Sequence, residues 1–373
     1  MGTYKKANSF HSLYSQVDGE TEEAMCRLAT LKEKLGDLKL SIKQLKVLTD
    51  AFSQLGNEWI IHPHTAAEIV RLQETDLPNY LIYRFRYDVN PTRLVVDEYP
   101  PLIQIEPTSI CNYRCVFCYQ TNKALTAKKN GHMGMMSFNL FREIIDQIEG
   151  HVQGITLASR GEPLLNPNLP EMLHYAAPKF LGFKVNTNLS KLTEEKAHAF
   201  FQAKVDTLVI SADAAEEPLY SKLRVNGNLN NVLEKSRMLR DIRAKHYSDS
   251  QTILRVSGVK VQKDQNLAQM EKLWGEIVDQ VSFVNYNPWE NPYDADLSQV
   301  TAPCSDLWRR LFVWWDGRCN PCDVDYLSHL EVGHLGKKTL HEIWNGTAYQ
   351  ELREKHLRKR RSSISPCNRC VVI

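Results

Sequence analysis

Three closely spaced cysteines are the first residues of this chain whose types and spacing could do chemistry. Cys111, Cys115 and Cys118 stand four and three residues apart within Cys111-Asn-Tyr-Arg-Cys115-Val-Phe-Cys118. Three thiolates on one loop can converge on one face of an iron–sulfur cubane, which usually takes four cysteines, so one iron would stay open to an external ligand. Zinc is the competing interpretation, although structural zinc normally has four nearby ligands. Three unrelated buried thiols are the alternative without a metal.

A second set of cysteines lies in the last seventy residues. The segment reads Cys304-x12-Gly317-x4-Cys322 and, 44 residues later, Cys367-Asn-Arg-Cys370. Four thiolates suffice for a fully ligated cluster, which suits electron transfer rather than substrate binding at iron. A four-thiolate zinc site is one alternative, and a redox dithiol at the C-x-x-C pair is another.

Two of the nine cysteines remain outside these sets. Cys319 lies three residues before Cys322, where it could be a spare ligand, a free structural thiol or a hydrogen-atom donor. Cys26 receives no role. A reduced cytosol disfavours disulfides, so the clustering of the other cysteines indicates metal binding or catalysis.

The elements that must position the first cysteine set alternate between strands and helices. Short β-rich runs separated by amphipathic stretches predict six βα units, which form a full or partial TIM-type barrel of parallel strands. In such α/β folds the chemistry lies at the carboxyl ends of the strands. The predicted strands are Leu102–Glu106, Gly154–Ala158, Phe183–Thr187, Thr207–Ser211, Leu254–Val261 and Ser282–Tyr286, with helices at Phe138–Ile148, Leu169–Ala176, Glu194–Ala203 and Leu229–Lys245 between them.

The pattern divides the chain into three regions. Residues 1–95 predict a helical extension, with leucines at helical spacing from Glu20 to Leu55 and a short helix at Ala66–Gln73. Residues 96–300 contain the partial barrel. Residues 301–373 predict a small second domain of loops, an aromatic-rich hairpin and one helix, Leu340–Leu357. The extension shows no chemistry of its own and could be a cap, a dimer contact or a docking element.

Polar side chains follow three successive predicted strands. Any one of these groups has a structural explanation, since strand ends and helix caps attract Ser, Asp and Asn. Their recurrence in order, behind the cysteine loop, instead predicts a binding site at this end of the barrel. The segments are Ser159-Arg160-Gly161-Glu162-Pro163, Asn186-Thr187-Asn188 and Ser211-Ala212-Asp213, the last followed by Arg224.

The C-x3-C-x2-C loop, with Phe117 before its last cysteine, resembles the radical S-adenosylmethionine (SAM) superfamily. The resemblance implies a [4Fe–4S] cluster whose open iron binds the amino and carboxylate groups of SAM, and a 5′-deoxyadenosyl radical formed from it. Arg160 and Ala214 depart from the family pattern, which has glycine at both positions. The SAM-binding residues implied by the resemblance are Gly161, Glu162, Pro163, Asn186, Thr187, Asn188, Ser211, Asp213 and Arg224.

The C-terminal segment resembles the shortened SPASM module called twitch, which begins with C-x9–15-G-x4-C and closes with C-x2-C. The resemblance implies one auxiliary [4Fe–4S] cluster on Cys304, Cys322, Cys367 and Cys370. A full SPASM module has further cysteines, so the shorter module fits this segment better.

A barrel with these two clusters resembles the radical SAM dehydrogenases that oxidise sugars and aminocyclitols. The resemblance implies removal of a hydrogen atom from a carbinol carbon, loss of a proton, and transfer of an electron to the auxiliary cluster, which yields a ketone. Related enzymes with the same metals epimerise a carbon or modify a peptide, and an epimerase would need a donor such as Cys319. An iron–sulfur electron carrier is the non-enzyme alternative. The implied partners are a sugar, aminocyclitol or peptide substrate and an electron donor such as flavodoxin or ferredoxin.

Two features qualify as substrate contacts. The loop from Asn285 to Asn291 is polar and aromatic and follows the sixth predicted strand, where it could contact substrate or form a structural turn. Arg255, in the fifth predicted strand, could point into the barrel or out to solvent.

Composition and charge narrow the class of protein. A net charge of +2 predicts no obligate polyanionic partner such as a nucleic acid. The basic run from Arg353 to Arg361 is interpreted as a solvated helix face, with a contact for an anionic substrate or partner as the alternative. The apolar run Leu311–Trp315 is too short to span a bilayer. The N-terminal sequence lacks the apolar core of a signal peptide, which predicts a cytoplasmic protein.

Overall fold

Six parallel strands form the centre of the computed structural model, which describes residues 3–5, 10–15, 19–263 and 265–373. Their neighbours follow the order β9-β8-β6-β5-β4-β2, and the register places Ile103 beside Ile155. The partial barrel predicted from the sequence is thus confirmed. The strands are β2 (Leu102–Ile105), β4 (Gly154–Leu157), β5 (Gly182–Thr187), β6 (Thr207–Ser211), β8 (Ile253–Lys260) and β9 (Gln280–Asn285).

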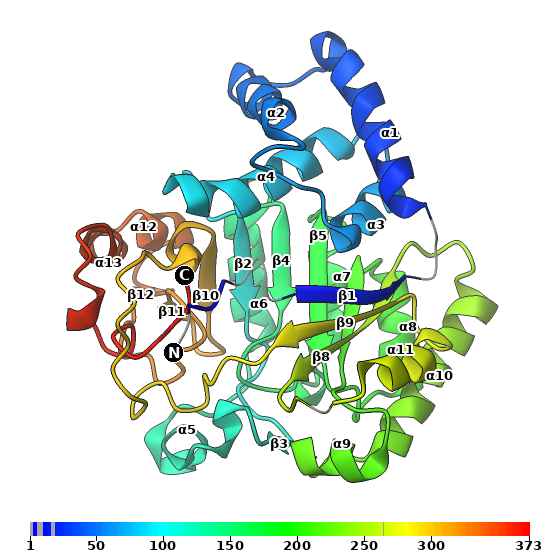
Figure 1. The fold of residues 1–373 in the computed structure, drawn as a ribbon, viewed down its shortest axis with the longest axis vertical. Helices are drawn as coiled ribbons and strands as arrows, with labels where there is room; N and C mark the ends of the chain where they lie inside the picture. The colour runs from blue at the N-terminus through cyan, green and yellow to red at the C-terminus, as the bar shows by residue number, and fades with distance from the viewer. Residues whose placement is uncertain (1–2, 6–9, 16–18, 264) are drawn as a thin grey trace.

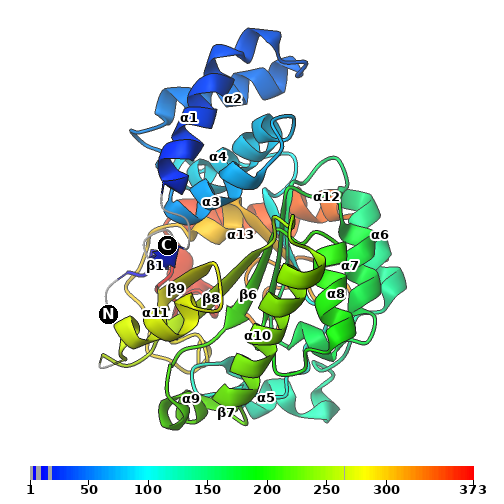
Figure 2. The same cartoon turned by 90° about the vertical axis from the view of Figure 1, so that its right-hand side faces the viewer.

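Amphipathic helices cover the outer face of this sheet (Figures 1 and 2). Ser137, Thr193, Asn228 and Asn266 cap four of them by accepting a hydrogen bond from a backbone N–H in the first turn. None of the helices in the described ranges is both long and apolar enough to cross a membrane. The covering helices are α6 (Phe138–Ile148), α7 (Leu169–Ala176), α8 (Glu194–Gln202), α10 (Leu229–His246) and α11 (Leu267–Gly275).

The C-terminal region extends the same sheet past β2. Strand β10 (Arg310–Val313) runs parallel to β2, and β11 (Arg318–Asn320) and β12 (Gly333–His334) continue antiparallel. Gly317 makes the turn between β10 and β11 with a φ of 88°, a left-handed conformation that glycine adopts without strain. The single helix predicted over 340–357 is wrong, because Asn345 and Gly346 divide it into α12 (Leu340–Trp344) and α13 (Thr347–Leu357).

The N-terminal region contains a strand that the sequence did not lead us to expect. Strand β1 (Phe10–Ser15) pairs antiparallel with β9 and covers the open edge of the partial barrel. The continuous helical pattern predicted from Glu20 to Leu55 is also broken, since residues 34–41 separate two helices. The four helices of the extension are α1 (Glu20–Glu33), α2 (Ile42–Gln54), α3 (Pro63–Arg71) and α4 (Leu77–Arg93).

Helices α1–α4 lie over the amino ends of the barrel strands, at the top of Figures 1 and 2, and have their own apolar core. The buried Tyr83 of α4 joins this core to the barrel. A Cβ added to Gly154, the first residue of β4, would come within 2.5 Å of the Tyr83 ring, and one on Gly182 of β5 within 2.9 Å. The two glycines therefore leave the space that the tyrosine fills.

Gly154→Ala tests this contact. We expect a loss of about 2 kcal/mol in the free energy of unfolding, measured by thermal or denaturant melting, because the core is overpacked. Gly36→Ala is the matched control, with no atom within 4 Å of its Cβ, and should change stability by less than about 0.5 kcal/mol. Adding Tyr83→Leu to Gly154→Ala should recover part of the loss. Equal stability of the two glycine variants would contradict the packing.

Candidate active site: two cysteine sets and the cavity between them

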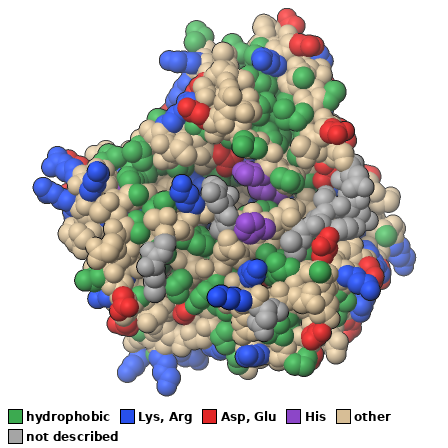
Figure 3. Space-filling model, in the orientation of Figure 1, with side chains coloured by type: hydrophobic (Ala, Val, Ile, Leu, Met, Phe, Trp, Pro, Cys, Tyr) green, Lys and Arg blue, Asp and Glu red, His purple; other side chains and the backbone are tan. Residues whose placement is uncertain are grey.

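A cavity of about 770 Å³ runs through the barrel, and all three regions of the chain contribute to its wall. The surface view shows a hollow at the centre of one face, below the helices of the extension, with histidine side chains beside it (Figure 3). Cys111, Cys115 and Cys118 line the cavity at its carboxyl-end side. The loop that the spacing pattern singled out therefore opens on the lumen of the barrel.

The three thiols are held by a loop that folds back on the end of the barrel. Strand β3 (Arg114–Cys115) pairs with β7 (Arg224–Val225), which sets Cys115 opposite Arg224. Burial raises the pKa of Cys111 to about 12 and also raises the pKa of Cys115 and Cys118. Without a metal these thiols stay protonated, so binding a metal must release their protons.

Glu162 connects the second and third strand ends. Its carboxylate accepts hydrogen bonds from the Thr187 hydroxyl, the Asn188 backbone N–H at 2.7 Å and the Leu164 backbone N–H at 3.1 Å. Burial raises the pKa of Glu162 despite these bonds. Gly161 allows the loop to lie against the first strand end, because an added Cβ would come within 2.2 Å of the Thr108 carbonyl oxygen.

Arg224 is buried beside the cysteine loop and aimed by Asp213. Its Nε lies 2.6 Å from Asp213 Oδ2, and its Nη1 lies 3.9 Å from Cys115 Sγ. Burial alone would lower the pKa of Arg224, but the Asp213 carboxylate outweighs it and raises the pKa, so the guanidinium stays charged. The arrangement places a fixed positive charge at the cavity wall, suited to a carboxylate.

The predicted SAM contacts all lie at the same end of the barrel. Two of them stand behind the cavity wall rather than in it. Seven of the nine predicted residues line the cavity. Pro163 instead begins a short 3-10 helix behind Glu162, and Asp213 stands behind Arg224. The lining residues are Gly161, Glu162, Asn186, Thr187, Asn188, Ser211 and Arg224.

Arg160, which departs from the family pattern, makes a buried ion pair with Glu106 at the end of β2. Its Nη2 lies 2.6 Å from Glu106 Oε1 and its Nε 2.7 Å from Oε2. Its Nη1 donates to the backbone oxygen of Tyr326, and its guanidinium lies 4.3 Å from the ring centroid of Trp314. This side chain therefore joins the barrel to the C-terminal domain. The sequence carried no signal for it, because both partners lie far from it along the chain.

The four C-terminal cysteines converge on a second, smaller cavity. Cys304, Cys322, Cys367 and Cys370 line it together with Val324, which also lines the main cavity. The buried Arg361 donates to four carbonyl oxygens in two segments around it, those of Ala302, Cys367, Cys370 and Val372. The interpretation of the basic run as a solvated face is therefore wrong for Arg361, and also for Arg353, which is buried and donates to the carbonyl oxygens of Leu307 and Trp344.

Cys319 lies apart from both cavities. It belongs to β11, is fully buried in the main apolar core, and its Sγ lies 3.7 Å from the Gly317 carbonyl oxygen. Burial raises its pKa well above the usual range. It is absent from the walls of both cavities. This position favours the structural thiol over the hydrogen donor.

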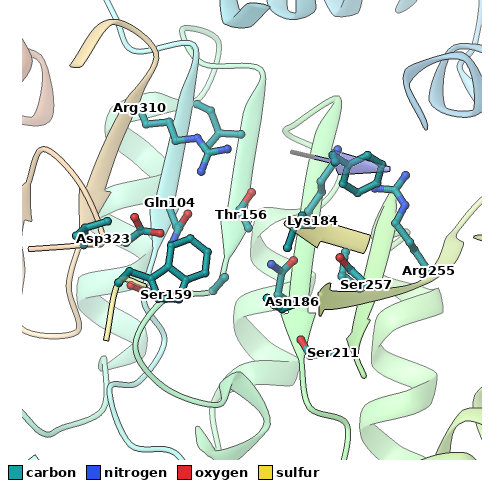
Figure 4. A pocket seen from close by; sticks show the side chains of 18 of the residues that line it. Gln104, Thr156, Ser159, Lys184, Asn186, Ser211, Arg255, Ser257, Arg310 and Asp323 are labelled. Carbon is teal, nitrogen blue, oxygen red and sulfur yellow. The ribbon is translucent and has the colours of Figure 1, made fainter. Parts of the chain in front are cut away.

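The substrate-contact candidates divide between the lumen and the loop. Arg255 points into the barrel and lines the cavity, which settles the two orientations left open by the sequence (Figure 4). Trp289 of the loop after β9 also lines the cavity, and its Nε1 donates to the Phe117 carbonyl oxygen at 3.1 Å. Tyr286 and Glu290 of the same loop are joined to each other by a hydrogen bond.

The donor set of each cysteine group fits an iron–sulfur cluster. In the described part of the chain, no group of three His, Cys, Asp or Glu side chains could hold a single metal ion. Three thiols instead border the large cavity, which leaves room beside them for a further ligand, and four border the small one. These are the donor numbers expected for a cluster with an open iron and for a fully ligated cluster.

Comparison with known families decides the identity of the fold. The model of the radical SAM superfamily matches residues 105–273, and that of SPASM, an iron–sulfur cluster-binding domain, matches residues 304–371. The chain belongs to the radical SAM superfamily. Its cofactors are therefore SAM and a [4Fe–4S] cluster, and its SPASM domain binds auxiliary iron–sulfur.

Sequence relatives with curated names match only part of this radical SAM protein. The probable GTP 3′,8-cyclase of Methanococcus maripaludis is 28% identical over 126 residues, and mycofactocin maturase MftC of Mycobacterium tuberculosis is 27% identical over 129 residues. The matches cover 34% and 35% of this chain but only 40% and 32% of the two relatives. Each relative is thus similar to about a third of this chain.

Solved structures share the architecture over more of the chain. BtrN in complex with AdoMet and 2-DOIA matches with a TM-score of 0.50 and 16% identity, over 74% of this chain and 94% of BtrN. SuiB of Streptococcus suis bound to S-adenosylmethionine matches with a TM-score of 0.52 and 14% identity, over 79% of this chain and 77% of SuiB. At these identities the likeness shows the fold alone.

Iron and zinc content test the assignment of the seven cysteines. Anaerobic reconstitution should give about eight irons per chain, falling to about four in the Cys111→Ala/Cys115→Ala/Cys118→Ala variant. Cys26→Ala, at an exposed position, should keep about eight. Zinc, measured in the same samples, should be low. About four irons in the unmodified protein, with zinc bound, would contradict an iron–sulfur cluster at the C-terminal site.

Asp213→Asn tests whether Arg224 is aimed by its partner. Loss of the ion pair should weaken SAM binding to the reconstituted protein about tenfold or more, because a misaligned guanidinium no longer meets the SAM carboxylate. Iron content should stay unchanged. Asp241→Asn, on the exposed face of α10, is the control and should bind SAM normally. Unaltered affinity in Asp213→Asn would remove Arg224 from the SAM site.

Proposed function

We propose that this protein is a radical SAM oxidoreductase that oxidises a secondary alcohol of a sugar or cyclitol to a ketone. When bound, SAM and its cluster supply the 5′-deoxyadenosyl radical that removes the carbinol hydrogen atom, while the auxiliary cluster accepts the second electron. The remaining proton passes to a base, so the substrate loses two hydrogens in total. The radical SAM family accounts for the formation of the radical. The cavity of this chain supports the oxidation of an alcohol.

The observation that carries the proposal is the closeness of the C-terminal cysteine site to the lumen. Val324 lines both cavities, and Cys322, two residues before it, borders the smaller one. A substrate in the lumen would lie next to an electron acceptor, as an oxidation requires. A simple exchange of a hydrogen atom, as in epimerisation, would not require it.

Asp323 is the candidate base. It lies between Cys322 and Val324, lines the main cavity, and its side chain points into the lumen near Gln104 (Figure 4). A carboxylate there can accept the alcohol proton as the electron leaves toward the neighbouring cluster site. We therefore assign Asp323 the proton-accepting role.

The rest of the lumen suits a polyhydroxylated ring. Hydroxyl and amide groups of Gln104, Thr156, Asn186, Ser211 and Ser257 project into it from five different strands or strand ends (Figure 4). Such groups can both donate and accept hydrogen bonds, which matches the two-way hydrogen bonding of sugar hydroxyls. These groups could therefore hold a sugar or cyclitol ring in the lumen through hydrogen bonds to its hydroxyls.

Peptide modification is a second candidate, favoured by particular relatives. Mycofactocin maturase MftC is 27% identical to this chain over 129 residues, and SuiB bound to precursor peptide SuiA matches 91% of this chain with a TM-score of 0.51. A peptide would have to enter a lumen whose open edge β1 occupies. The edge strand and the polar lumen therefore favour the small substrate.

Isotope transfer tests the reaction. The reduced, reconstituted protein should convert SAM to 5′-deoxyadenosine, and a sugar or cyclitol deuterated at the reacting carbon should transfer one deuterium to it and give a ketone. Asp323→Asn should lower ketone formation at least a hundredfold while 5′-deoxyadenosine is still released, because hydrogen abstraction does not need the base.

Asp296→Asn, at an exposed carboxylate in the loop before the C-terminal domain, is the control and should keep normal ketone formation. No 5′-deoxyadenosine from the unmodified protein would remove the radical chemistry altogether. 5′-Deoxyadenosine with a substrate that returns epimerised, or with a crosslinked peptide, would replace the oxidation by one of the alternatives.

A further inference from the structure

Two of the cations that line the cavity share one carboxylate partner, away from the cysteine loop. Lys184 of β5 and Arg255 of β8 line the cavity, and both reach the same oxygen of Glu68 in α3. Lys184 Nζ lies 2.6 Å and Arg255 Nη2 lies 3.7 Å from Glu68 Oε1. Glu68 is only 6% exposed and does not line the cavity. It therefore stands behind the two cations and holds them side by side toward the lumen.

The second carboxylate oxygen of Glu68 already has another hydrogen-bond partner. This oxygen, Oε2, accepts a hydrogen bond from the Tyr80 hydroxyl. Burial would raise the pKa of Glu68, but Lys184, Arg255 and Arg84 outweigh this effect and hold it well below its usual range. The carboxylate is thus ionised and shared between more positive charges than it can neutralise.

Lys184 and Arg255 share this carboxylate, and Asp206, whose pKa burial raises to about 7, also interacts with Lys184. Arg84 has its own partner, Asp88, at 3.2 Å. Arg255 Nε donates to Gln280, but its Nη2 is buried without a hydrogen-bond acceptor. A buried guanidinium that lacks an acceptor costs free energy unless a ligand supplies one.

The neighbouring histidine, His64, is uncharged. His64 lines the same part of the cavity, and burial together with Arg255 and Arg84 lowers its pKa well below the usual range. It is therefore neutral at neutral pH. The ring can accept or donate one hydrogen bond without altering the charge of the site.

Strand geometry sets the distance from these cations to the reacting end of the cavity. Lys184 lies two residues before Asn186 on β5, and Arg255 two residues before Ser257 on β8. Two residues along a strand span about 7 Å. This is about the length of one sugar ring, so a ring in the layer of Asn186 and Ser257 could reach the cations with one substituent (Figure 4).

We propose that Lys184 and Arg255 form an oxyanion subsite, so that the substrate is a sugar or cyclitol bearing a phosphate or carboxylate group. This inference rests on the proposed function and names its substrate class. The oxyanion would bind both cations and place the ring between the subsite and the SAM end of the lumen. Glu68 acts as a positioning residue behind them.

A purely structural ion pair would not need this arrangement. An ion pair that only joins α3 to the barrel requires a single cation opposite Glu68. Lys184, whose Nζ lies 2.6 Å from Glu68 Oε1, is that cation. Arg255 adds a second buried charge at a longer distance, facing the cavity. The sharing of one carboxylate by two cations and the position of both cations in the cavity wall together favour a ligand.

Equilibrium binding to the SAM-loaded, unreduced holoenzyme tests the subsite without turnover. Inorganic phosphate, glucose 6-phosphate, glucuronate and glucose are titrated by calorimetry at constant ionic strength. Glucose 6-phosphate or glucuronate should bind at least tenfold more tightly than glucose, and the stronger of the two identifies the anion. Lys184→Gln and Arg255→Gln should each weaken phosphate and glucose 6-phosphate binding about tenfold or more.

Two further variants keep the test decisive if a cation is needed for folding. Arg255→Lys should retain most of the affinity, and Glu68→Gln, which removes the opposing charge at equal size, should strengthen it. Arg142→Gln, an exposed position on α6, is the control and should match the unmodified protein. Melting curves show which variants are folded.

The inference is overturned if no anion binds the unmodified protein, or if folded Lys184→Gln and Arg255→Gln bind as it does. Either result leaves the proposed oxidation standing as long as 5′-deoxyadenosine and a ketone are formed. Loss of 5′-deoxyadenosine formation in the unmodified protein, with anion binding intact, would instead overturn the proposed function and keep the subsite.

Discussion

The buried ion pair between Glu106 and Arg160 is the interaction on which the relative position of the two cysteine sites depends. Glu106 ends the first barrel strand just before the Cys111 loop, and Arg160 lies in the loop after the second. Both are almost completely buried, which would be costly for lone charges. Further hydrogen bonds offset this cost. Arg160 also donates a hydrogen bond to the Tyr326 carbonyl oxygen, and Glu106 accepts hydrogen bonds from the backbone N–H groups of Arg160 and Trp315. One pair thus holds the SAM end of the barrel against the C-terminal domain.

Aromatic contacts reinforce the same joint from the cysteine loop. Tyr119 follows Cys118 directly, and its ring centroid lies 5.1 Å from that of Tyr326, four residues after Cys322. The Tyr119 hydroxyl donates to the Ser159 carbonyl oxygen, and the Tyr326 hydroxyl accepts from the Asn122 side chain. Electron transfer between two sites depends on a fixed separation, and these contacts leave little freedom for the loop to move. The packing thus serves the chemistry proposed for the lumen between them.

The sequence predicted what is local and missed what is made by distant contacts. Strand and helix periods placed the six strands within two residues, because each element buries its own face. The first cysteine set is local as well, because it lies on one loop, whereas the second set was grouped by its resemblance to a known module. Arg160 could not be interpreted, since its partner Glu106 lies 54 residues away. Strand β1 was missed because its pairing with β9 joins opposite ends of the chain, and the direction of Arg255 depends on strand register, which a single sequence does not show.

The N-terminal extension is a wall of the reaction chamber rather than an appendage. His64 of α3 and Arg84 of α4 line the cavity, and β1 completes the sheet edge that a six-stranded barrel leaves open. The described residues at the two ends of the chain also meet, with Tyr4 and Ile373 joined by a backbone hydrogen bond. Radical chemistry requires exclusion of water and of competing hydrogen donors. The helices that cover the amino end also supply Glu68, the ion-pair partner of Lys184 and Arg255 in the cavity wall. The extension therefore both bounds the cavity and sets the charge of part of its wall, and a change in the extension should affect both together.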